Sequence, residues 1–176
     1  MNPEPLTQAA KSAGFSEAVF LDGLTVECEA HLRAYCNPEG CPNHGQNWVF
    51  PPMCGSLAAC AERAAAFNCG LVLQSATALT PPTDMSVYKT LNREHNLRLR
   101  ALLENTAFAN RPLLALTSGG CVFCAECAYP APCIKPGLRM NSLSAYGIDV
   151  GKLCAKAHLA YSFRPDMVYF TALILL

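Results

Sequence analysis

A run of four cysteines lies in residues 121–133 of this chain. The segment reads GGCVFCAECAYPAPCIKP, and its thiols belong to Cys121, Cys124, Cys127 and Cys133. Thiols spaced three residues apart lie on one side of a tight, turning loop, so the first three reach three corners of one iron–sulfur cubane. Cys133 follows in a proline-stiffened return and supplies the fourth corner. The pattern predicts a metal loop over residues 121–136, with a 4Fe-4S cluster as the favoured cofactor.

The residues around this run suit a cluster of thiolates. Gly119 and Gly120 let the backbone approach closely before Cys121, and loop amides can then point at the cluster sulfides. Lys135 and Arg139 follow the run and offset its negative charge. The last gap is longer than in bacterial two-cluster ferredoxins, which favours a single cluster. Zinc is the alternative, although structural zinc prefers two cysteine pairs separated by a longer arm.

A second set of candidate metal ligands lies in residues 36–60, in an irregular, proline-rich stretch. The set consists of Cys36, Cys41, Cys54 and Cys60, with His44 as a substitute ligand. Because the gaps are long and unequal, a second cluster or metal ion and a site without metal both remain open. Cys60 falls in the first turns of an expected helix. There it is either a thiolate stabilised by the helix dipole or a small apolar residue on an alanine-rich helix.

The remaining cysteines and two aromatic residues have simpler expected roles. Cys69 and Cys154 are expected in the core, because free cysteine is among the most buried residue types. Cys28 carries no assignment. Trp48 and Tyr146 either shield a cluster from solvent or pack in the core.

Composition bounds the class of protein. The chain has 176 residues, 11 of them cysteine, and its 13 basic residues balance 13 acidic ones. Cysteines clustered at steps of three do not pair with one another without strain, which disfavours a disulfide scaffold. The first residues show no basic segment followed by an apolar stretch, so no signal peptide is expected. We therefore expect a cytoplasmic metalloprotein.

The same features limit the expected partners. No long basic run is present, which disfavours binding to nucleic acid. The final apolar stretch, VYFTALILL, is too short to span a bilayer, so no membrane partner is expected and this stretch is predicted to be a buried strand. A redox protein remains the expected partner, and the sequence does not specify an oligomeric state.

Hydrophobic periodicity predicts alternating helices and strands. Ser56 is the expected N-cap of one helix, with Gly70 after its end; Asp84 or Ser86 is the expected cap of the longest helix, and Ser142 of a later one. Helices are expected at 4–13, 57–68 and 85–109, short helical pieces at 142–157, and strands at 15–22, 71–79, 112–120 and 166–176. This alternation predicts one α/β domain over residues 1–176, a layered sheet with flanking helices. Two Cys-rich metal-binding loops, 36–60 and 121–136, would extend from strand ends.

Two stretches resemble a known family, the predicted metal-binding proteins of anaerobic bacteria and archaea, which is filed as a domain of unknown function. Residues 120–153 show its Cys-x-x-Cys-x-x-Cys run, a Tyr-Pro, a fourth Cys and a Ser-x-x-Ala-x-Gly-Ile-x-Val segment. Residues 41–60 are similar to its pattern of Cys, Asn-Tyr-Gly, Trp, Cys-Pro-Pro and Gly-Ser-Leu. The resemblance covers nearly the whole chain. It implies metal or iron–sulfur binding and no particular reaction.

The chain departs from the family pattern at two positions. His44 stands where the family has Tyr, and Phe50 stands where it has the Cys before the double proline. Either Cys54, just past the prolines, replaces the missing thiolate, or the N-terminal site is degenerate.

Three functional hypotheses follow from these residues. The first is an iron–sulfur protein with an electron-transfer or redox-accessory role, because the sequence has no nucleotide-binding loop, metalloprotease helix or nucleophile elbow. The second is an enzyme that uses an open cluster site, for which the N-terminal set is the candidate. The third is a zinc-stabilised interaction module.

Overall fold

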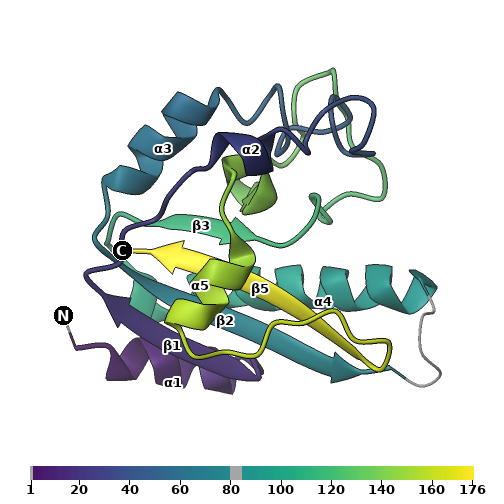
Figure 1. Ribbon diagram of the computed structural model, residues 1–176. Coiled ribbons are helices and arrows are strands. Elements are labelled where there is room, and N and C mark those ends of the chain that lie inside the picture. Colours follow the sequence, from purple (N-terminus) through teal and green to yellow (C-terminus); the bar gives the residue numbers. More distant parts are fainter. Residues whose placement is uncertain (1, 80–84) are drawn as a thin grey trace.

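A five-stranded sheet with helices on both faces forms the centre of the protein (Figure 1). The computed structural model describes residues 2–79 and 85–176. The strand order is β1-β2-β5-β3-β4, and neighbouring strands are antiparallel except for the parallel pair β3–β4. The expected α/β class is confirmed, with a mixed sheet.

The helices and strands have the following bounds: α1 Glu4–Ser12, β1 Glu17–Asp22, α2 Ala30–Arg33, α3 Leu57–Ala65, β2 Cys69–Ala78, α4 Met85–Leu103, β3 Leu114–Thr117, β4 Asn141–Ser142, α5 Val150–Lys156 and β5 Met167–Leu175. Three 3₁₀ turns add η1 Thr106–Phe108, η2 Pro136–Leu138 and η3 Ser144–Tyr146. Within residues 2–79 and 85–176, no helix combines the length and apolar character needed to cross a bilayer.

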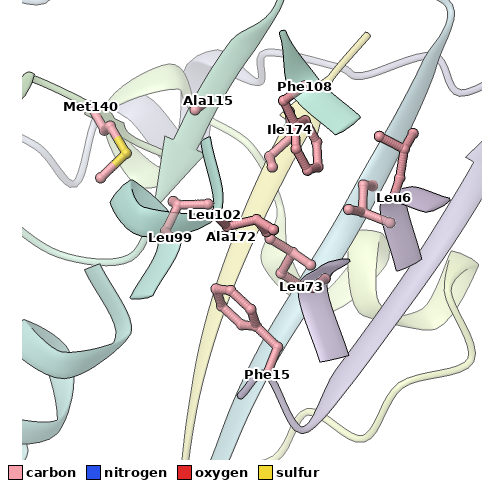
Figure 2. Packing of buried hydrophobic residues seen from close by; sticks show 12 residues of the cluster. Leu6, Phe15, Leu73, Leu99, Leu102, Phe108, Ala115, Met140, Ala172 and Ile174 are labelled. Carbon is pink, nitrogen blue, oxygen red and sulfur yellow. The ribbon is translucent and has the colours of Figure 1, made fainter. Parts of the chain in front are cut away.

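The core is divided by the sheet into two apolar layers, because successive side chains of a strand point to opposite faces. Leu71 and Leu73 of β2 pack with residues of α1 and α4, as Figure 2 shows for Leu73, Leu6 and Leu99. Val72, between them, packs on the other face with residues of α3 and α5. The two central strands β2 and β5 are therefore buried on both sides, which accounts for their nearly continuous apolar sequences.

The structure corrects several expected element boundaries. Ser56 is confirmed as the N-cap of α3, where its hydroxyl accepts from the Ala59 amide at 3.2 Å. Gly70 does not follow the end of that helix. It lies within β2, where the side chains of Leu24 and Leu173 would come within 3.0 Å of an added Cβ.

The caps of the later helices also differ from expectation. The long helix α4 ends at Leu103, and Asn105 then caps the separate turn η1 by accepting from the Ala107 amide. Ser142 belongs to β4, and Asp149 is the residue that caps α5. Ser86 lies inside α4, and the alternative cap Asp84 lies outside the described residues.

Strand β3 is short because Ser118 ends its ladder. The Ser118 hydroxyl donates to the Thr171 carbonyl at 2.7 Å and accepts from the Thr171 amide at 3.0 Å, so a side chain replaces the next backbone pair. The chain then leaves the sheet as the loop that carries Cys121. In Figure 1 this green loop lies at the same end of the molecule as the dark blue segment that follows α2. The prediction that the Cys-rich loops extend from the sheet is thus confirmed for 121–136, which follows β3 directly.

Because β5 is buried on both faces, shortening one of its side chains should destabilise the protein. Leu173→Ala should lower the free energy of unfolding by about 2–5 kcal/mol, because Leu173 is fully buried and its loss leaves a cavity. Leu97→Ala on the exposed side of α4 is the matched control and should change it by less than about 0.5 kcal/mol. Urea unfolding of both variants tests this; equal losses would contradict the core assignment.

Candidate metal centre

The two Cys-rich loops contact each other directly. The Trp48 indole N–H donates to the Ala131 carbonyl at 3.1 Å, and its ring packs edge-on against Tyr129 with 5.6 Å between centroids. Gly120 lies against the Asn43 side chain, whose oxygen would be 2.9 Å from an added Cβ. Residues far apart in sequence therefore form one surface, and a side chain added at Gly120 would have to displace that of Asn43.

The four cysteines of the C-terminal run share one small cavity of about 30 Å³. Cys121, Cys124, Cys127 and Cys133 line it and are all partly buried. Trp48, Val49 and Arg139 are among the residues that complete its wall. The structure thus brings this predicted set together, and Trp48 has the shielding position expected for it.

The donor chemistry of this cavity fits a polynuclear cluster. Among the described residues, no three Cys, His, Asp or Glu side chains converge on a position for one metal ion. The four thiols of the C-terminal run all belong to residues that line one cavity. Thiolate ligands of a cubane attach to separate irons, so soft donors around a shared cavity are the donor set that such a cluster takes. A bound cluster would supply one-electron redox chemistry.

Cys121 holds its proton more firmly than an ordinary cysteine, because its surroundings raise the pKa of its thiol. Burial raises the pKa of Cys121, and the nearby thiols of Cys124, Cys127 and Cys133 raise it further, while the Phe123 amide opposes the shift by hydrogen bonding to the sulfur. Only thiolates bind metal, so loading must release protons. The Phe123 amide is also the kind of loop N–H that stabilises thiolate charge.

Cationic side chains brace this loop at its rim. The Lys135 ammonium group donates to the Phe123 carbonyl at 3.0 Å, and the Arg139 guanidinium lies 5.8 Å from the centre of the Trp48 ring. Both cations were expected to offset cluster charge. The structure adds that each of them also holds the loop through a specific contact.

Helix α4 holds the start of the 121–136 loop through hydrogen bonds to its backbone. The Arg93 guanidinium donates to the Val122 carbonyl at 2.5 Å, and the Asn96 amide group reaches the Ser118 carbonyl at 3.5 Å. Gly119 has φ +74°, and the Asn92 side chain would be 2.6 Å from a Cβ at this position. Glycine is therefore required here both by backbone conformation and by the close approach of α4.

The N-terminal cysteines separate into two pairs. Cys36 lies close to Cys41, and Cys54 lies close to Cys60. Buried Phe50 packs in the same cluster as Cys36 and Cys54, and the partly buried Cys41 and Cys121 border that cluster. An aromatic ring thus lies where the family pattern has a thiol.

The surroundings of Cys60 favour its thiolate form. Arg63 donates to its sulfur at 3.3 Å and Arg33 at 3.8 Å, and the Cys54 thiol donates as well. The Cys54 hydrogen bond is the largest cause, and together these contacts lower the Cys60 pKa to about 6 although the residue is buried. The same interaction raises the pKa of Cys54, which keeps its proton. Of the two expected roles for Cys60, the structure favours the stabilised thiolate.

The two arginines are also structural braces. Arg33 donates to the Ala145 carbonyl and, at 2.8 Å, to the Gly55 carbonyl, while Arg63 donates to the Cys54 carbonyl at 2.7 Å. They connect α2, the Cys54 turn and η3 around one sulfur. Arg63 lies 5.4 Å from the centre of the buried Tyr146 ring, so Tyr146 shields this pair rather than the C-terminal cavity.

Sequence reasoning missed these arginines and the α4 residues. Arg63 had a usable signal, because residues three apart lie on one face of a helix and Arg63 follows Cys60 at that interval. Arg33, Asn92 and Arg93 had none, since only the tertiary fold brings them to the loops. Cys69 and Cys154 are buried as expected, and Cys28 lies near Cys60.

Comparison with known proteins agrees with this donor chemistry. Residues 20–176 match the family model described as predicted metal-binding protein (DUF2284), so the chain belongs to that family. Searches of curated proteins and of solved structures found no match.

The contact between α4 and the loop predicts an effect of Gly119→Ala on metal retention. The variant should lose more than about 1 kcal/mol of stability, because alanine is strained at positive φ. It should also retain less metal, since Asn92 must move. The control is Gly137→Ala in the same loop region, where nothing lies within 4 Å of the added Cβ. Metal content per chain and urea unfolding measure both effects, and equal behaviour of the two variants would contradict the role of α4.

The Cys60 pKa predicts a pH dependence of stability in the reduced, metal-free protein. Folding lowers this pKa from 9.0 to about 6, so the stabilisation is full above the unfolded pKa and is lost as pH falls through 6. The free energy of unfolding should rise by roughly 1–3 kcal/mol between pH 6 and 8. Cys60→Ala should flatten that rise. A wild-type profile that stays flat or falls over this interval would contradict the thiolate assignment.

Proposed function

We propose that this metal-binding protein holds a 4Fe-4S cluster on Cys121, Cys124, Cys127 and Cys133 and exchanges electrons with a redox protein partner. The observation that carries the proposal is the single cavity shared by these four thiols. Soft sulfur donors, a loop amide on Cys121 and nearby cations are the features that thiolate-bound iron–sulfur clusters use.

The surroundings of the cavity support electron exchange with a partner. The loop lies at one end of the sheet, and Ala125, Glu126 and Ile134 are exposed around the cysteines. Ile134 has 69% of its surface exposed, which gives a partner an apolar contact beside Cys133. A cluster bound this close to the surface leaves only a short distance for an electron to cross.

The N-terminal pairs have a supporting role in this proposal. Cys36 and Cys54 belong, with Phe50 and Ala145, to a buried cluster against which Cys121 packs. Arg33 and Arg63 already compensate the negative charge that the lowered pKa of Cys60 favours. We infer that this layer stabilises the cluster loop and that the C-terminal run alone carries the iron.

Metal analysis after anaerobic purification or reconstitution tests the proposal. The wild-type chain should contain about four iron and four sulfide and show a visible absorbance that dithionite reduces. Cys124→Ser should lose most of this iron. Cys69→Ser is the matched control, because Cys69 donates to the Leu176 carbonyl at 3.0 Å, far from the loop in the sheet, and serine can keep that bond.

The same measurement separates the alternatives. About eight irons, halved by Cys41→Ser, would assign a second cluster to the N-terminal set. Zinc without iron or sulfide would overturn the proposal in favour of a zinc-stabilised module.

A further inference from the structure

A second cavity, of about 510 Å³, lies next to the metal loops and has no part in holding metal. Ser118 and Ser144 are among the residues that line it. Ser118 is the residue that ends β3, three positions before Cys121. The Ser144 carbonyl accepts from the Cys36 thiol at 3.7 Å. Two residues that line this cavity are therefore direct neighbours of the Cys-rich loops.

The cavity exists because β3 ends early. Backbone pairing of β3 with β5 covers residues 114–116 against 173–175, and the Ser118 side chain then takes over at Thr171. Among the described strands, only β2 pairs with residues 167–170 of β5. The cavity lies along this half of β5 and is closed by Tyr88 of α4, Val150 of α5 and the segment that precedes β5.

Aromatic rings dominate the lining. Tyr88 packs on Phe170 with 4.9 Å between ring centroids, and Tyr161 packs on Phe163 at 6.3 Å. Phe163 is 99% exposed, and Tyr161 and Tyr88 are about two-fifths exposed at 41% and 39%. Large apolar faces directed at water are costly unless something covers them. Exposed ring faces beside a concave wall suit a planar ring system that stacks on them.

The polar groups of the cavity favour an uncharged occupant. Among the described residues that line it, Arg164 is the one charged side chain, and both oxygens of Asp166 pair with its guanidinium at 3.0 and 2.8 Å. No free charge is left to bind an ionic group. Burial raises the pKa of Tyr88 and of Tyr161, so both hydroxyls keep their protons and remain able to donate to carbonyl or ring nitrogen atoms.

We propose that this cavity binds an uncharged, planar molecule of two or three fused rings bearing hydrogen-bond acceptors, held beside the cysteine loops. Its volume is within the range of small-molecule sites. Binding of the ligand depends on this cavity alone. A redox role for the ligand, as a molecule of the flavin or quinone class, rests on the proposed function, because it needs the metal centre nearby.

Lumiflavin, an uncharged three-ring flavin, is the probe for the test. Titrated with the full chain, its fluorescence should be quenched saturably by stacking on tyrosine. Phe163→Ala should weaken binding about threefold to tenfold, the range of one lost aromatic contact. Because Phe163 is exposed, its replacement leaves the core intact. Val150→Trp should abolish binding by filling the cavity, and Leu97→Ala, exposed elsewhere on α4, should leave it unchanged.

The outcomes separate this inference from the proposed function. Cys124→Ser, which should lose iron, should still bind lumiflavin, so failure of the cluster does not remove the pocket. Absence of saturable quenching would overturn the inference, and so would binding that survives both Phe163→Ala and Val150→Trp. Tighter binding of a sulfonated naphthalene than of lumiflavin would overturn the assignment of an uncharged ligand.

Discussion

The end of β3 at Thr117 is the constraint on which both cavities depend. A strand in the middle of a sheet normally continues until its neighbours end, but here the Ser118 hydroxyl satisfies the Thr171 backbone in place of another residue of β3. The chain is then free to turn away at Gly119 and carry its cysteines above the sheet edge. The same departure leaves residues 167–170 of β5 without a second strand. The metal loop and the aromatic cavity are thus two results of one interrupted ladder.

Cys60 and Cys121 have opposite pKa shifts, although their side chains are identical. Cys60 is a thiolate without any metal, because two guanidinium groups and the Cys54 thiol stabilise its charge. Cys121 is held protonated by burial and by its neighbouring thiols. Arginine already compensates the charge of Cys60, whereas Cys121 must release its proton before it can bind metal. The cluster proposed for the C-terminal run rests on the one cavity that its four cysteines line.

Local signals in the sequence predicted most elements that are determined locally. The cap at Ser56, the strand expected at 71–79 and the buried final strand follow from side-chain chemistry and periodicity within a few residues. At Gly70 a tertiary contact decided the outcome: glycine was expected to follow a helix, but in the fold it makes room for Leu24 and Leu173. The other errors are local. Asn105 caps η1 just after α4 ends, and Asp149 caps α5, each by accepting from an amide two or three residues further along the chain.

The sequence by itself determined that Cys121, Cys124 and Cys127 share one short loop, because their spacing brings three thiols together whatever surrounds the loop. It also determined that the loop begins with two glycines. Only the tertiary structure decided which other residues meet that loop: Trp48 and Asn43 from the opposite loop, and Asn92 and Arg93 from α4. These contacts depend on strand order and on helix packing across the sheet, and no spacing within the chain encodes them. The division of the N-terminal cysteines into pairs has the same origin, since Arg33 reaches Cys60 only through the fold.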